Sequence, residues 1–220
     1  MIYKKLFVFV IVQSIFISAY SHQPSAEVNK GRHPFYVGGF GGFGSSTWYG
    51  LVPSRKNSNG AIMMSTPTDA EEGGHVWGGV FGYEFIPYFA VEASYTQYAD
   101  AIITFDQMSI FSFKHNGLHS FVSHTDAVSF MGKAMFFIPN TLVRVFSSAG
   151  VADVHRRDML LDQWKLSPTF GFGVNFHLTP SLMGEVGGNY TAGYGESQLN
   201  PTQTYIPFLY SMTLRLAYCF

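Results

Sequence analysis

The C-terminal stretch from Phe208 to Phe220 reads FLYSMTLRLAYCF. Every second residue of it is large and apolar, and apart from Leu209 the residues between them are small or polar. Successive side chains of a β-strand point to opposite faces, so this alternation predicts a strand with one apolar and one more polar face. Arg215 belongs to the polar face. We therefore expect this strand to separate an apolar environment from a polar one.

The N-terminal residues predict export from the cytoplasm. Lys4 and Lys5 precede an apolar run over residues 6–17, and Ala19-Tyr20-Ser21 offers small residues before a cleavage point after Ser21. This order of regions is typical of a secretory signal peptide. An uncleaved anchor is the alternative, but the run is short for a membrane-spanning helix. We expect a signal peptide at 1–21, a short periplasmic segment at 22–34 and one domain at 35–220.

The composition is apolar without long apolar runs. Charged residues make up 12% of the chain, about half the share in soluble domains, and aromatic residues make up 17%. Beyond the signal peptide no run of roughly 18 apolar residues occurs, which excludes a transmembrane helix there. A membrane β-barrel has these properties, because lipid-facing and lumen-facing residues alternate. The formal net charge of −1 argues against a nucleic-acid partner, and the single Cys219 excludes an internal disulfide.

Three short proline-containing turns alternate with four long polar segments. The turns at 86–88, 139–141 and 179–181 each separate two alternating runs. Outer-membrane barrels have short periplasmic turns and long extracellular loops. The sequence thus predicts an all-β fold, a transmembrane antiparallel up-and-down β-barrel of eight strands. The strands are expected at 35–43, 75–85, 89–98, 125–137, 142–152, 165–178, 182–191 and 205–220, with long loops at 44–74, 99–123, 153–163 and 192–204.

The second long loop contains a hairpin signal. Asn116-Gly117 lies between residues 102–114 and 118–123, and Asn-Gly favours a two-residue β-turn. We expect this loop to be a protruding β-ribbon.

The charges of the expected strands share one face. Each ionisable side chain in these stretches occupies the alternate positions that carry the less apolar residues, which we assign to the lumen. This agrees with the cost of about 2–4 kcal/mol for a charge that faces lipid at mid-membrane. The first strand has aromatic residues on both parities and cannot be oriented. Six charged residues are expected to form one lumen network close to the periplasmic end: Glu84, Glu92, Lys133, Arg144, Glu185 and Arg215.

These inward charges should pair, because an isolated buried charge is costly. Glu185 and Arg215 lie on adjacent strands and are expected to pair directly, and Glu92 is expected to pair with Lys133 or Arg144. An eight-stranded barrel is just wide enough for side chains to fill it. The network is interpreted as a structural plug, and the gate of a small polar pore is the alternative.

The sequence resembles the OmpA-like, eight-stranded outer-membrane β-barrel family over nearly all of the mature chain. The resemblance rests on residues 35–39, 79–85, 89–95, 168–174 and 214–220. It implies a Gram-negative outer-membrane location and a terminal strand whose Leu216, Tyr218 and Phe220 are read by the barrel-assembly machinery. Larger members carry a peptidoglycan-binding domain after the barrel, which is not expected here. Small members are adhesins, surface antigens or serum-resistance proteins that act through their loops.

Three functions are compatible with these observations. The first is a non-catalytic barrel that acts structurally or through its loops on host or envelope surface molecules. The second is a small gated, porin-like channel, and the third is a lipid-modifying enzyme. Outer-membrane lipids and lipopolysaccharide are the other expected partners, and no cofactor is expected. The basic cluster His155-Arg156-Arg157 is a candidate for contact with lipopolysaccharide phosphates, and an ordinary solvated loop is the alternative.

Catalytic and metal-binding readings have weak support in the sequence. A lipid A deacylase would show a His-x-Ser pair, which does not occur, although His124 and Asp126 lie near Ser120, Ser123 and Ser129. A spatially assembled triad of these types stays open. The histidines show no metal-ligand spacing, and we expect them to be solvated loop residues.

Overall fold

The computed structural model describes residues 34–52, 66–194 and 205–220. The expected signal peptide and most of the segment at 22–34 lie outside the described residues. The described part contains ten strands and two short helices. Their bounds are β1 Phe35–Thr47, η2 Tyr49–Leu51, β2 Asp69–Glu71, β3 Gly74–Ile86, β4 Phe89–Gln97, β5 Ala101–Thr104, α3 Ile110–Lys114, β6 Ser120–Phe137, β7 Val143–Arg157, β8 Asp162–Thr179, β9 Leu182–Thr191 and β10 Phe208–Cys219.

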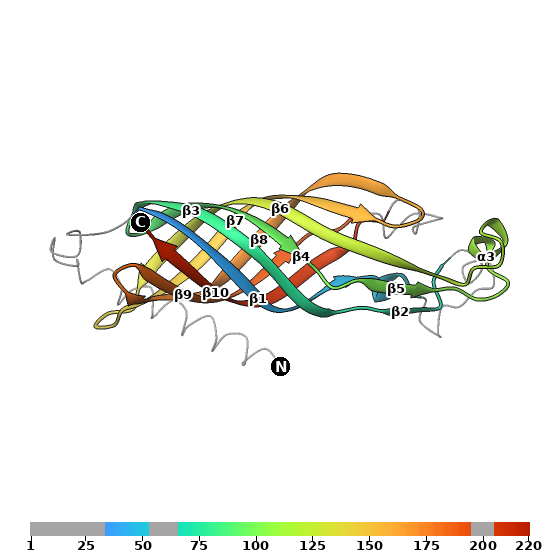
Figure 1. Ribbon diagram of the computed structural model, residues 1–220, viewed down its shortest axis with the longest axis horizontal. Coiled ribbons are helices and arrows are strands. Elements are labelled where there is room, and N and C mark those ends of the chain that lie inside the picture. Colours follow the sequence, from blue (N-terminus) through green and yellow to red (C-terminus); the bar gives the residue numbers. More distant parts are fainter. Residues whose placement is uncertain (1–33, 53–65, 195–204) are drawn as a thin grey trace, which may run out of the picture.

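Eight of the described strands form a closed antiparallel barrel (Figure 1). The order is β1-β3-β4-β6-β7-β8-β9-β10, so each strand pairs with its neighbours along the barrel sequence. The first and last strands close it in register from Tyr36 opposite Cys219 to Thr47 opposite Phe208. β2 and β5 are additional strands that extend the sheet from β6. The predicted eight-stranded up-and-down barrel is confirmed.

The alternation of β10 separates lipid from lumen. Tyr210, Met212, Leu214, Leu216 and Tyr218 are between 50% and 59% exposed, whereas the residues between them are at most 7% exposed. The same parity holds on β3, where Trp77, Phe81 and Phe85 face outward and Val76 and Val80 are buried. These outward apolar side chains are exposed on the surface of the protein, and lipid is the apolar environment that covers them in a membrane.

The structure orients β1, which the sequence could not. Phe35, Val37 and Phe43 are exposed, and Tyr36 is buried and faces the lumen. Tyr36 fits there because Gly82, its cross-strand partner on β3, leaves room for the ring: a Cβ on Gly82 would lie 2.1 Å from Tyr36 Cζ. The inward aromatic ring and the inward glycine are therefore complementary.

Aromatic side chains mark both edges of the lipid-facing belt. At the periplasmic edge Phe35 contacts Tyr83 and Phe220, with ring centroids 4.7 and 6.0 Å apart. Toward the other edge Phe170, Tyr190 and Tyr210 are successive cross-strand neighbours on β8, β9 and β10. Such girdles are typical of outer-membrane barrels.

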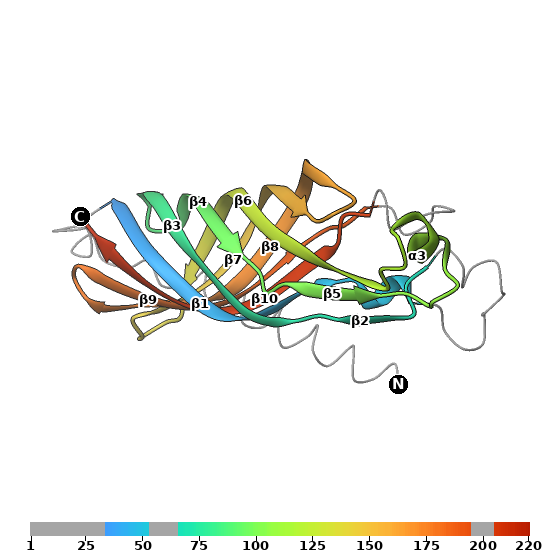
Figure 2. The same cartoon turned by 45° about the vertical axis from the view of Figure 1, so that its right-hand side comes forward.

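The strands continue beyond the belt at the end opposite the C-terminus. β2, β5, α3 and the β7–β8 hairpin lie at that end in both views (Figures 1 and 2). The expected long third loop at 153–163 is wrong, because β7 and β8 pair as far as Arg157 opposite Asp162. The second loop is a ribbon only where β5 pairs with residues 120–123 of β6. The expected Asn116-Gly117 hairpin is also wrong, because these residues follow the helix α3.

Candidate functional site

Four of the expected lumen charges form one buried ion cluster. Arg215 Nη1 lies 2.9 Å from Glu92 Oε1 and 3.0 Å from Glu185 Oε1. Lys133 Nζ lies 2.7 Å from Glu92 Oε1 and also donates to Glu185. All four side chains are nearly inaccessible to solvent. The cluster has two positive and two negative members, so its charges balance within the lumen.

Strand register explains these contacts. Arg215 and Glu185 are direct cross-strand partners on β10 and β9. Glu92 is opposite Met131 on β6, two residues from Lys133. The β4–β6 and β9–β10 pairs face each other across the lumen, where the side chains meet. The expected direct contact of Glu185 with Arg215, and that of Glu92 with Lys133, are both present.

Arg144 pairs with Glu84, whereas Glu92, which was expected to pair with Lys133 or Arg144, pairs with Lys133. Arg144 Nη1 donates to both carboxylate oxygens of Glu84 at 3.0 Å, and Arg144 Nε donates to Asn175 Oδ1 at 2.8 Å. Arg144 is opposite Phe137 on β6, four residues closer to the periplasmic turn than Lys133. It therefore reaches Glu84, near the end of β3, at a level below Glu92.

Tyr36 completes the ion cluster and was not identified from the sequence. Its hydroxyl donates to Glu92 Oε1 at 2.6 Å. The signal that could have found it is Gly82 on β3, once the register of the two strands is known. Lys133 Nζ also lies 3.9 Å from the centroid of the Phe146 ring, and Arg215 lies over Phe40. Aromatic faces thus cover the cations where carboxylates do not.

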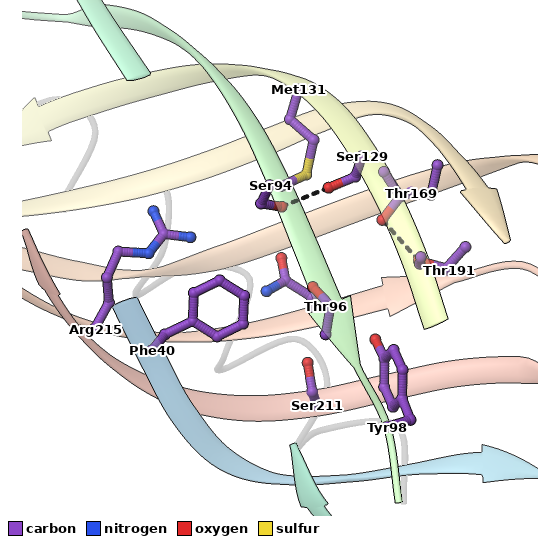
Figure 3. A pocket seen from close by; sticks show the side chains of 13 residues that line it. Phe40, Ser94, Thr96, Tyr98, Ser129, Met131, Thr169, Thr191, Ser211 and Arg215 are labelled. Carbon is purple, nitrogen blue, oxygen red and sulfur yellow. Dashed lines mark hydrogen bonds between the residues drawn. The ribbon is translucent and has the colours of Figure 1, made fainter. Parts of the chain in front are cut away.

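A small polar cavity lies on the extracellular side of this cluster (Figure 3). Its volume of about 20 Å³ is enough for roughly one water molecule. In its wall, cross-strand neighbours are hydrogen-bonded to each other: Ser94 to Ser129 at 2.7 Å, and Thr169 to Thr191 at 2.8 Å. Figure 3 shows Arg215 at one end of this pocket. The interior is therefore polar here, but narrow.

An apolar layer follows the cavity toward the extracellular end. It explains Leu209, which breaks the small-residue pattern of β10 and is completely buried. Apolar side chains filling the lumen exclude water from this level. The members of the layer are Val76, Tyr98, Ala127, Ala152, Val154, Ile206 and Leu209.

An aromatic core lies beyond that layer, among the extracellular segments. Trp48 packs against Tyr205 and Phe121, with ring centroids 5.1 and 6.0 Å apart. Phe111 of α3 stacks on Phe105 at 4.3 Å. We call this group the extracellular core; it comprises Trp48, Leu51, Ala70, Ala101, Ile103, Phe105, Phe111, Phe121 and Tyr205.

Arg156 joins the extracellular core to the barrel wall. Its guanidinium lies 4.5 Å from the Trp48 ring centroid, donates to the Tyr205 carbonyl and contacts Asp158. Burial lowers the pKa of this guanidinium below its ordinary value, and Asp158 opposes the shift. Arg156 is thus not available for the expected contact with lipopolysaccharide. His155 faces outward instead, stacked on Trp164 with its nitrogens 3.2 and 2.8 Å from Asp126 and Asp162.

Two of the three serines considered for catalysis are separated from His124 by the alternation of β6, whereas Ser120 and Asp126 share its outward face. The Asp126 carboxylate contacts His155. His124 faces outward, with Nδ1 2.6 Å from Asp100 Oδ1. Ser123 is completely buried, and Ser129 lines the lumen cavity. His124 and these two serines thus lie on opposite faces of one strand.

The terminal residues lie on the lipid-facing side of the closing seam. Leu216 and Tyr218 are outward on β10, and the Phe220 ring stacks against Phe35. The Phe220 amide donates to the Phe35 carbonyl at 2.9 Å. The last residue therefore contributes to the closure of the barrel.

Comparisons with known proteins agree with this architecture. Neisserial surface protein A superposes with a TM-score of 0.50 and 14% identity, over 84% of this chain and 97% of that chain. The outer membrane protein AlkL, solved in DMPC bilayers, superposes with a TM-score of 0.50 and 14% identity, over 91% of this chain and 96% of that chain. No family model and no curated protein sequence matches this chain. At this identity the likeness concerns the fold, which is that of the eight-stranded outer-membrane β-barrels.

The fold and its outer surface together define the compartment. Among the described residues, no helix is long and apolar enough to cross a membrane. The outward apolar belt, the aromatic girdles and the short turns at one end are features of Gram-negative outer-membrane barrels. The chain is therefore an outer-membrane protein.

Proposed function

We propose that this chain is a non-catalytic outer-membrane barrel with a plugged interior that acts through its extracellular part in surface interaction. The observation that carries the proposal is the contrast between the two halves. The lumen is filled by an ion cluster and an apolar layer, whereas the extracellular segments have an aromatic core of their own. A structured surface projecting from a closed barrel is suited to contact with other molecules rather than to passage of solutes.

Conductance tests the plug. Wild-type protein in planar lipid bilayers should conduct little, because two successive layers fill the lumen. The double variant Leu209→Ser, Arg215→Ser should leak small ions, because it weakens both layers; each single variant is the matched control and should leak less. A large, steady conductance of the wild-type protein would contradict the plug.

Surface binding tests the role of the extracellular part. Bacteria that display the wild-type protein should adhere to host cells or envelope components better than bacteria displaying a barrel in which residues 102–122 are replaced by a short Gly-Ser linker. Heat-modifiable migration must be equal for both proteins, since it reports a folded barrel. Equal adhesion at equal surface level would remove the support for this role.

A gated channel is the second candidate. The small polar cavity between the ion cluster and the apolar layer favours it, because a conduction path needs polar groups along the lumen. Opening would require the apolar layer to rearrange. Voltage- or pH-dependent opening events in the same bilayer recordings would support this candidate over the plug.

Lipid-modifying catalysis is the third candidate, and we propose that it is absent. The separation of His124 from Ser123 and Ser129 supports this view. On the outward face, which Ser120 shares, the His124 imidazole contacts Asp100 and the Asp126 carboxylate contacts His155. Turnover of labelled lipid A by the purified protein, lost on His124→Ala, would contradict it.

The barrel-assembly machinery, outer-membrane lipids and lipopolysaccharide are the other proposed partners. Their proposed contacts are Leu216, Tyr218 and Phe220 for assembly, and the apolar belt for lipid.

A further inference from the structure

The tip of the second extracellular loop exposes large apolar side chains that the fold does not use. α3 presents Phe111 and Ser112 to the interior, where Phe111 joins the extracellular core. Ile110 and Phe113, three residues apart and thus on one side of the helix, are 41% and 65% exposed. Met108 and Leu118, before and after the helix, are 66% and 52% exposed. We call Met108, Ile110, Phe113 and Leu118 the apolar tip.

The backbone of this tip is held in place. The Ser109 side chain caps α3 by accepting from the Ser112 amide at 3.2 Å, and Asp106 accepts from the Met108 amide at 2.9 Å. His115 stacks on Phe111 with a centroid distance of 4.4 Å. The exposed side chains are therefore presented from an ordered turn of chain that is anchored in the extracellular core.

The position and charge of the tip restrict its partner. Figure 1 places α3 at the end of the molecule opposite the C-terminus. Residues 107–119 include Lys114 and two histidines and no acidic residue. The neighbouring ribbon is acidic, with exposed Asp69, Glu71 and Asp106. The apolar tip thus has the basic Lys114 beside it, and the ribbon that carries the tip is acidic.

Size favours a lipid surface over a protein. The apolar tip offers on the order of a few hundred Å² of apolar area, against roughly 800 Å² per partner in a standard protein complex. Apolar residues next to a basic one are, in contrast, the composition by which peripheral segments enter the interface of an anionic bilayer. Many copies in one outer membrane would add avidity to a weak individual contact.

We propose that the apolar tip inserts into the surface of an apposed membrane that carries anionic lipid headgroups. Met108, Ile110, Phe113 and Leu118 enter the boundary between headgroups and acyl chains, and Lys114 contacts the headgroup phosphates. The inference rests on the proposed function, since it names the partner class of the extracellular part.

The test uses the full protein in nanodiscs of zwitterionic lipid, mixed with phosphatidylcholine vesicles with or without phosphatidylglycerol. Co-flotation should show binding that increases with the anionic lipid. Phe113→Ser should weaken it by about tenfold or more, because the largest inserted side chain is lost. Lys114→Glu should weaken binding to the anionic vesicles in particular. Leu166→Ser is the matched control, since Leu166 is 61% exposed on β8 away from the tip, and should have no effect.

Absence of wild-type binding to every vesicle would overturn the inference, as would equal effects of Phe113→Ser and Leu166→Ser. Since Phe113 makes no contribution to the extracellular core, its variant should retain heat-modifiable migration. Cell adhesion that is lost with residues 102–122 but unaffected by Phe113→Ser would refute the lipid partner and leave the proposed function standing. Adhesion that is retained both after replacement of residues 102–122 and in Phe113→Ser would contradict the lipid partner and the proposed function.

Discussion

At the scale of single residues, the lumen is organised by charge balance and by ring-to-glycine complementarity. Glu92 and Glu185 each contact both Lys133 and Arg215, so no member of the cluster depends on a single partner. Removing one charge leaves an unbalanced charge in a poorly solvated interior, whereas removing one of each sign preserves balance. This difference can be measured as non-additivity.

We predict that Arg215→Met destabilises the barrel by about 3–5 kcal/mol, because Glu92 and Glu185 then share only Lys133. The double variant Arg215→Met, Glu185→Gln should cost clearly less than the sum of the two single variants, since the Glu92–Lys133 pair stays balanced. Urea unfolding from lipid vesicles measures all three. The exposed Glu71→Gln is the control, and additive effects would argue against a coupled cluster.

A second residue-scale prediction concerns Gly82. Gly82→Val should impair folding, because a Cβ there would meet the Tyr36 ring at 2.1 Å. Gly79→Val on the same strand faces outward, where the nearest atom is 3.7 Å away, and should be tolerated. Combining Gly82→Val with Tyr36→Ala should recover part of the heat-modifiable barrel. No recovery would show that the clash is not with the ring.

At the scale of elements, the barrel strands extend beyond the membrane. One part of β8 lies in the lipid-facing belt and another lies in water at the extracellular end. Phe172 is 66% exposed in the belt, and Leu166 is 61% exposed near the extracellular end of the same strand. Phe172→Lys should cost about 2–4 kcal/mol, because it puts a charge in hydrocarbon. Leu166→Lys should cost little, because water reaches it. Equal costs in urea titrations would mean that the belt ends elsewhere on β8.

The spanning elements were predictable because lipid imposes period-two alternation on every strand. β9 has the predicted bounds at 182–191. The parity predicted for each oriented strand agrees with its burial pattern. The extension of the β7–β8 hairpin was not predictable from alternation. Outside the membrane water reaches both faces of a strand, so polar residues are accepted on either face and the period-two pattern is lost. Asn116 and Gly117 do have positive φ values of 55° and 80°, as an Asn-Gly hairpin requires. The same dihedrals also follow a helix, and the sequence alone does not choose between the two.

The candidate site was predictable in its membership more than in its pairing. The alternation of the strands correctly placed the six predicted charges on the lumen side. The position of Arg144 along the barrel axis relative to Glu84 depends on strand stagger, which alternation does not encode. The extracellular core was missed for a related reason. Trp48 and Tyr205 are distant in sequence and meet only because β1 and β10 pair.

At the scale of the whole molecule, closure depends on the seam between the first and last barrel strands. The Phe220 ring stacks on Phe35, and their backbones exchange hydrogen bonds. Cys219, in contrast, is a small buried residue beside Ala217 and Tyr36 on the lumen side. Two roles for Phe220 are therefore possible: packing at the seam, and recognition by the assembly machinery before the barrel closes.

Deletion of Phe220 should reduce the amount of heat-modifiable barrel in the outer membrane far more than Cys219→Ser does. Phe35→Ala separates the two roles, because it removes the stacking partner and leaves the terminal residue in place. If Phe220 acts mainly in recognition, Phe35→Ala should assemble at near wild-type level in cells. If it acts through packing, Phe35→Ala and the deletion should be equally impaired, both in cells and when purified protein refolds into lipid vesicles without the machinery. Wild-type assembly of the deletion variant would contradict both roles.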